Sequence, residues 1–299
     1  MRQKLEIVRK MTGLTQTKLA DKIGVSFPAF NNWWTGKSIP RAEAQAAIDA
    51  IFLDVTGQKI IPADVLRAKK SALLNKAAGH KNIVREILRN PDIRDQLVLK
   101  LTYHSNRIEG STLTEPETSA ILFQNTALPN RSLTEHLEAK NHQTALAYLL
   151  DYLSSGGAVG EALVLKLHGI VVNSIMPDAG TYRRHAVRIV GVHLPTANYL
   201  KIPGLIAKSM RTAAHPTDDV IAVSANIHSQ FEQIHPFADG NGRVGRLLMN
   251  AMLLKADLAP AIIRLEQKQL YYTYLHKAQT TDDRSLLEHF ICDAITDGF

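Results

Sequence analysis

The stretch HPFADGNGRVGR, His235 to Arg246, concentrates one histidine, one acid, three glycines and two arginines in twelve residues. Its Gly240-Asn241-Gly242 run lets the backbone approach an anion closely, with N–H groups pointing inward. A helix beginning here would direct its positive N-terminal end at the same anion. The stretch therefore predicts a site for a phosphate-bearing ligand.

The same glycines, Gly240, Gly242 and Gly245, also fit the spacing of a dinucleotide-binding turn, which requires a β-strand directly before it. The preceding segment instead places Ile227, Phe231 and Ile234 at helical spacing. This context excludes a Rossmann domain.

The charged residues of the stretch indicate what the anion is. Arg243 and Arg246 are three residues apart, on one face of the first turn of an expected amphipathic helix, RVGRLLMNAMLLKADL. Cationic side chains oppose the helix dipole there, so we expect them to serve a polyanion. Asp239 is suited to hold Mg²⁺ together with substrate phosphates, and His235 can accept a proton near neutral pH.

With these residues in place, the stretch resembles the HxFx(D/E)GNGRxxR motif of the Fic (filamentation induced by cAMP) family at each defined position. The resemblance implies a mainly α fold, a Fic-fold helical core with a small β-hairpin flap. The segment AGTYRRHAVRIVGVHLPT, residues 179–196, is similar to that flap, and Val187, Ile189, Gly191 and Val192 read as a short two-stranded element. The implied activity is transfer of AMP from ATP to a hydroxyl side chain of a target protein, with self-modification included.

The resemblance also implies a role for each site residue. His235 would be the general base, and Asp239 would bind Mg²⁺ between the α- and β-phosphates. Arg243 would hold the β-phosphate and Arg246 the γ-phosphate, while Phe237 anchors the loop in the core. The remaining implied nucleotide contacts are the anion hole Gly240, Asn241 and Gly242, and the adenine neighbours Tyr272 and Gln279.

Two alternatives stay open within this fold. Relatives often have asparagine where this chain has Gln279, which leaves transfer of another nucleotide, or of phosphate, open. Tyr271 and Tyr272 could equally be core aromatics.

The segment SNRIEG, residues 105–110, is similar to an autoinhibitory motif of the same family. Ser105 and Glu109 are four residues apart, on one helical face, and Gly110 would end that helix. The resemblance implies that Glu109 pairs with Arg246 and keeps it from the γ-phosphate. The alternatives are an ordinary exposed glutamate at a helix end, or a glutamate that also supports removal of AMP.

Residues 14–40 read as two short helices joined by a tight turn containing Gly24. They resemble the Xre/λ-repressor-type helix-turn-helix family, which implies a five-helix-type domain over residues 1–58. In that family Gln16 would contact phosphate, and Phe27, Asn31 and Asn32 would face bases. A protein-interaction module of the same fold, or a nucleotide-sensing transcriptional regulator, stays open.

Bulk properties agree with these expectations. The 299 residues carry a net charge of +7, which suits polyanionic partners. The single cysteine, Cys292, excludes an internal disulfide, is expected to be buried, and favours a cytoplasmic protein. The lack of a long apolar run predicts that the chain has no membrane span and no membrane partner. A homodimer stays open. The expected organisation is 1–58 helix-turn-helix, 59–95 connecting helices, 96–112 inhibitory helix and 113–299 Fic domain, with its core at about 160–262.

Overall fold

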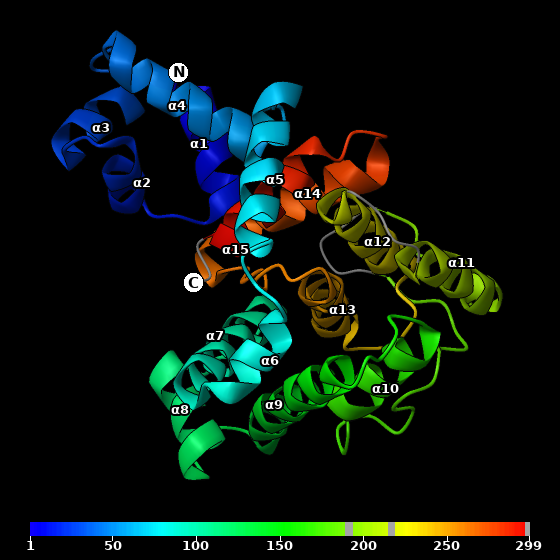
Figure 1. Ribbon diagram of the computed structural model, residues 1–299. Coiled ribbons are helices and arrows are strands. Elements are labelled where there is room, and N and C mark those ends of the chain that lie inside the picture. Colours follow the sequence, from blue (N-terminus) through cyan, green and yellow to red (C-terminus); the bar gives the residue numbers. More distant parts are fainter. Residues whose placement is uncertain (189–193, 215–218, 297–299) are drawn as a thin grey trace.

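The computed structural model describes residues 1–188, 194–214 and 219–296, and within those ranges the regular structure is helical, without strands. Figure 1 shows a small N-terminal group of helices beside a larger helical body. Within these ranges no helix is long and apolar enough to cross a membrane.

The N-terminal module consists of α1 (Arg2–Thr12), α2 (Gln16–Ile23), α3 (Phe27–Trp34) and α4 (Ala42–Val55). The Thr15 hydroxyl caps α2 by accepting from the Lys18 N–H, and Gly24 ends it with a φ of 80°. A small core of its own forms around Leu5, Leu19 and Phe30. Residues 1–58 thus hold four helices, where a five-helix type was expected.

The next helix, α5 (Ala63–Ala77), packs against the C-terminal helix α15 (Ser285–Thr296) and not into the small module's core. Two adjacent lysines fasten it. Lys70 lies 2.7 Å from Asp219 and 2.5 Å from Glu288, and Lys69 pairs with Asp293. This helix therefore belongs to the larger body.

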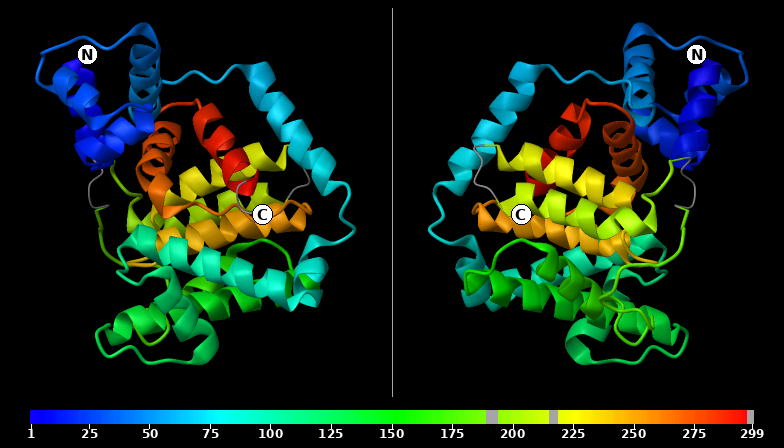
Figure 2. Two further views of the ribbon diagram at one scale, coloured as in Figure 1. Left: turned by 90° about the vertical axis from the view of Figure 1, so that its left-hand side faces the viewer. Right: turned by 90° about the vertical axis from the view of Figure 1, so that its right-hand side faces the viewer.

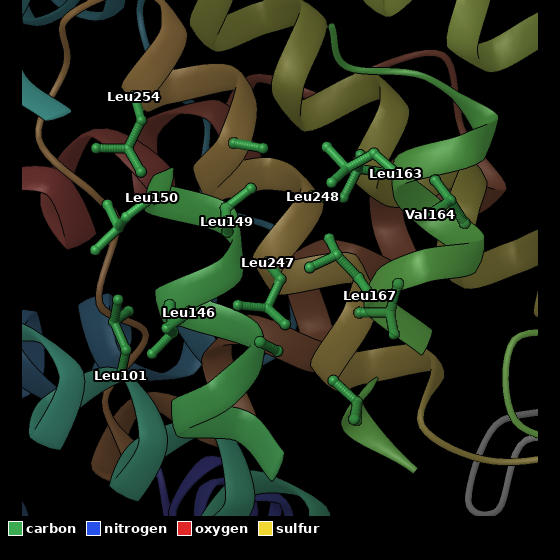
Figure 3. Close-up of a cluster of buried hydrophobic side chains, with 14 of the residues drawn as sticks. Leu101, Leu146, Leu149, Leu150, Leu163, Val164, Leu167, Leu247, Leu248 and Leu254 are labelled. Carbon is green, nitrogen blue, oxygen red and sulfur yellow. The ribbon is translucent and has the colours of Figure 1, made fainter. Parts of the chain in front are cut away.

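The larger body is built around α13 (Asn241–Lys255), whose residues are buried along almost its whole length. It is surrounded by α7 (Pro91–Glu109), α9 (Leu133–Ser154), α10 (Glu161–Val171) and α12 (Val220–Ile234). Figure 3 shows leucines of α9, α10 and α13 meeting in the core. The expected helix forms as α13, but its polar residues Arg243, Arg246 and Asn250 are buried in the body and do not face solvent.

Shorter helices complete the body: α6 (Ile83–Arg89), α8 (Glu115–Gln124), η1 (Tyr199–Lys201), α11 (Ile202–Ala214), η2 (Leu265–Gln267) and α14 (Lys268–Thr280). A second core joins α12, α14 and α15 and buries Cys292, as expected.

The N-terminal module touches the body through α14. The Thr273 hydroxyl donates to the Val55 carbonyl over 3.2 Å, and the Tyr274 hydroxyl lies 3.3 Å from Asp54. Both views of Figure 2 show the module beside this part of the body.

The expected flap is only partly described. Ile189, Gly191 and Val192 lie outside the described residues, and Val187 is described without strand structure. The two flanks nevertheless meet, because the Thr196 hydroxyl donates to the Val187 carbonyl over 2.8 Å.

Candidate active site

The glycine-containing stretch forms the loop between α12 and α13. His235 ends α12 in the left-handed region with φ 52°, and Gly240 precedes α13 with φ 77°. The Asn241 side chain forms two hydrogen bonds across the loop. It accepts from the Phe237 N–H and donates to the Phe237 carbonyl, both over 2.9 Å. Asn241 thus braces the loop with its side chain, and only its backbone N–H remains for the expected anion hole.

Phe237 anchors the loop in the core, as expected. Its ring is fully buried and stacks on the His168 imidazole with centroids 3.6 Å apart. His168 in turn accepts from the Gly180 N–H over 2.9 Å, so the loop is fixed to α10 and to the start of the expected flap segment.

His235 is half-buried at the open side of this loop. Its Nδ1 lies 3.3 Å from the Glu232 carbonyl, a contact that a hydrogen on Nδ1 would satisfy. Nε2 would then be the unprotonated nitrogen, ready to accept a proton. Burial lowers the pKa of His235, which keeps the ring neutral at physiological pH.

Arg246 lies at the bottom of the site and is held by α7. Its Nε donates to the Ser105 hydroxyl and its Nη2 to the Ser105 carbonyl, each over 3.0 Å, and Nη2 lies 2.7 Å from Glu109 Oε1. The two carboxyl oxygens do not both engage, so the pair is monodentate. Burial by itself would lower the pKa of Arg246, but Glu109 raises it above its ordinary value.

Glu109 also fills the space above the first turn of α13. A Cβ atom added at Gly242 would lie 2.2 Å from Glu109 Oε1. The carboxylate therefore rests directly on the glycine whose N–H belongs to the expected anion hole. Gly110 ends α7 directly after Glu109, with φ 112°.

Arg243, which is 2% exposed, is also held by a glutamate. Its Nη1 donates to Glu138 of α9 over 2.8 Å, and its Nη2 lies 3.6 Å from Asp239. Glu138 was not anticipated, because it lies 105 residues away and carries no motif. One nitrogen of each arginine, Nε of Arg243 and Nη1 of Arg246, is buried and has no hydrogen-bond partner among the residues that the structure describes. Unpartnered buried donors are costly, and a bound ion or water is among the features that account for them.

Asp239 is an exposed carboxylate at the rim, with 57% of its side chain accessible. In the described ranges no group of three or more His, Cys, Asp or Glu side chains could hold a metal alone. Mg²⁺ in phosphate sites commonly uses one or two carboxylates and completes its shell with phosphates and water. Asp239 fits that use.

The two tyrosines of α14 differ. Tyr271 is buried, with its hydroxyl 2.7 Å from His228 Nε2, and is a core residue. Tyr272 is half-buried, and burial together with nearby Glu109 raises its pKa, so it borders the site. Gln279 donates to the Ser229 carbonyl over 3.2 Å, which ties α14 to α12.

Two further residues near the loop gave no sequence signal. Glu232 is buried on α12, its Oε1 has no partner among the described residues, and burial raises its pKa to about 8. Arg183, within the expected flap segment, is buried and donates to the His235 carbonyl. Glu232 belongs to no motif, and Arg183 lies 52 residues from His235 in the sequence.

The residues expected to contact DNA lie apart from this loop, in the N-terminal module (Figure 1). Phe27 and Asn32 of α3 are exposed, while Asn31 and Gln16 are half-buried. All four lie on α2 and α3, the two helices joined at Gly24.

The loop lies within the segment that is similar to known proteins. Residues 158–253 match the model of the Fic/DOC family. The chain is 35% identical over 198 residues to protein adenylyltransferase Fic of Nematostella vectensis, which covers 62% of this chain and 44% of that protein. It is 34% identical over 203 residues to the protein of the same name from Drosophila melanogaster, covering 64% and 39%. The chain thus spans less than half the length of these curated relatives.

Solved structures share the fold. Fic-1 (residues 134–508) of C. elegans superposes with a TM-score of 0.67 at 21% identity, covering 94% of this chain and 83% of that one. A Fic family protein from Desulfovibrio desulfuricans gives a TM-score of 0.65 at 23% identity, covering 80% and 74%. The helical body therefore has the Fic fold.

Proposed function

We propose that this chain is an autoinhibited protein adenylyltransferase, which transfers AMP from ATP to a hydroxyl side chain of a protein. One observation carries the proposal. A neutral, half-buried imidazole, His235, stands beside a glycine loop with two buried arginines, each of which has one nitrogen without a partner in the described part of the chain. The names of the relatives support it.

In this reaction the residues of the loop would bind the phosphates and accept the proton of the target hydroxyl. Arg243 and Arg246 would bind the β- and γ-phosphates, and the N–H groups at the start of α13 would receive charge developing at the phosphates. His235 Nε2 would take the proton from the target hydroxyl as its oxygen attacks the α-phosphorus. The bond from that phosphorus to the bridging oxygen breaks, and pyrophosphate leaves. Mg²⁺ bound at Asp239 would neutralise phosphate charge.

Autoinhibition follows from the position of Glu109 in this scheme. The carboxylate occupies both Arg246 and the space above Gly242, so a γ-phosphate cannot approach without displacing it. Like charges in one site repel strongly when partly buried. ATP would therefore bind with its phosphates shifted from the productive position.

The reaction type is tested by labelling protein with ATP carrying the label in the α- or the γ-phosphate. AMP transfer predicts protein labelling from α-labelled ATP alone, and labelled UTP serves as the comparison for nucleotide preference. The His235→Ala variant should abolish labelling. Transfer of the γ-label would show phosphate transfer instead, and unchanged labelling of His235→Ala would remove His235 from the role of base.

We propose a second function, DNA binding, for residues 1–58. Supporting it are two short helices with a tight turn, exposed Asn32, and a net charge of +4, from nine Lys/Arg and five Asp/Glu in residues 1–60. A mobility-shift assay on random-sequence DNA, with and without ATP, tests this. Asn32→Ala should weaken sequence preference; lack of any shift would favour a protein-interaction module, for which exposed Phe27 is suited.

A further inference from the structure

Arg183, at the base of the flap, is buried without a carboxylate partner in the described part of the chain. Its residue is 2% exposed, yet its guanidinium contacts only main-chain carbonyls. Burial lowers its pKa. A buried cation is costly unless it is well hydrogen-bonded. The carbonyls that accept from Arg183 therefore identify the segments that it joins.

One pair of carbonyls belongs to the catalytic loop. Arg183 Nε donates to the His235 carbonyl over 2.7 Å, and Nη2 lies 3.3 Å from the Ile234 carbonyl. Both are at the C-terminal end of α12, where the helix dipole favours a cation. The Arg183 N–H also donates to the Pro236 carbonyl over 3.0 Å. The arginine thus grips three consecutive residues centred on His235.

The other pair belongs to the two flanks of the flap. Nη1 donates to the His185 carbonyl over 2.6 Å, on the entering side, and Nη2 donates to the Ala197 carbonyl over 2.7 Å, on the leaving side. One planar group therefore joins both flanks to the loop. Only a guanidinium presents several donors in a fixed fork, and lysine cannot reproduce that geometry.

His235 needs such support, because it is a non-glycine residue in the left-handed region, a conformation that most residues avoid unless their surroundings fix it. The hydrogen bonds to its own carbonyl and to those of its neighbours stabilise that conformation from beneath the loop.

We propose that Arg183 is a positioning residue that holds the His235 loop against the two described flanks, residues 185–188 and 194–197, and so keeps His235 Nε2 oriented toward the hydroxyl of the target. This rests on the proposed adenylyltransferase function and adds to it the group that orients the general base. Arg183 touches neither substrate nor the reacting atoms.

The test compares Arg183→Lys with Arg184→Lys, both in the Glu109→Gly background. Arg184 is the exposed neighbour and receives the same chemical change. Amide hydrogen exchange is measured without substrate over residues 185–188, 194–197 and 234–237. Transfer rates from α-labelled ATP to a protein target and ATP affinity by calorimetry are measured on the same samples.

The proposal predicts that Arg183→Lys speeds exchange in both the flap flanks and the His235 loop, and lowers the transfer rate by about tenfold or more, since small misplacements of reacting groups cost that much. ATP affinity and the Arg184→Lys control should not change. Faster exchange in one segment alone, or a transfer rate equal to that of the control, would overturn it. If no variant transfers AMP, the proposed function fails, and hydrogen exchange still decides whether Arg183 couples the two segments.

Discussion

At the scale of single residues, both buried arginines of the loop are paired with carboxylates of the chain. Arg246 is bound by Ser105 and Glu109, and its Nη1 has no partner among the described residues. Arg243 is bound by Glu138, and its Nε likewise has none there. An anion that binds these arginines would therefore compete with Glu109 and Glu138.

The protonation of His235 gives a first prediction. Burial lowers its pKa, and Arg183 nearby acts in the same direction, although the Glu232 carbonyl opposes them. A lowered pKa means that the imidazole stays neutral to more acidic pH than a free histidine does. An NMR titration of the free enzyme should place the His235 midpoint below 6.5, with His235→Gln used to assign the resonance. A midpoint at or above that value would contradict the buried, neutral base.

The motif predicted the residues of the loop because their chemistry is contiguous in sequence. The pairing of Glu109 with Arg246 could be predicted too, because the segment SNRIEG resembles the autoinhibitory motif of the Fic family. Glu138 and Arg183 could not, because they reach the loop from 105 and 52 residues away through folding alone.

Among the elements, the pairing of α12 with α13 decides how the loop is presented. Gly245 lets the two helices approach: a Cβ atom there would lie 2.3 Å from Glu232 Oε1 and 3.2 Å from the Phe231 ring. The two arginines near a helix start predicted an amphipathic helix. The burial of its polar residues could not be predicted, because it depends on the packing of α6, α7, α9, α10 and α12 around α13.

Gly245→Ala should therefore destabilise the protein. Overpacking a filled core costs about 1–3 kcal/mol, which outweighs the gain of up to about 1 kcal/mol that alanine brings within a helix. Urea unfolding measures the change. Gly204→Ala is the matched control, because Gly204 lies in α11 with open space around its Cα; equal stability of the two variants would contradict the tight α12–α13 contact.

At the scale of the whole molecule, α5 follows the N-terminal module in the chain and packs against the C-terminal helix α15 (Figure 2). Lys70 of α5 bonds Asp219 at the start of α12 and Glu288 of α15, and the Lys70 and Glu288 side chains are largely buried. The individual helices of this region can be predicted from sequence periodicity. Which helices pair with one another cannot, because nothing in the sequence distinguishes Lys70, which binds Asp219 and Glu288, from its neighbour Lys69.

Lys70→Met should lower the free energy of unfolding by about 2 kcal/mol, because it leaves Glu288 buried without its cation while the half-exposed Asp219 is screened by water. Lys69→Met is the control, since Lys69 and Asp293 are more exposed, and its effect should be smaller. Equal losses of unfolding free energy for the two variants, measured by urea unfolding, would contradict a larger contribution from the Lys70 ion pairs.

The central claim, that Glu109 restrains an AMP-transferring site by holding Arg246, is tested most directly by the rate of protein labelling from α-labelled ATP. The wild type is compared with Glu109→Gly and with Glu109→Gly combined with His235→Ala, each incubated with cell lysate. The account predicts labelling that rises by about tenfold or more in Glu109→Gly, since removing a competitor for Arg246 that is worth about 1.4 kcal/mol changes the rate tenfold, and that is lost in the double variant. Equal labelling by the wild type and Glu109→Gly would contradict it.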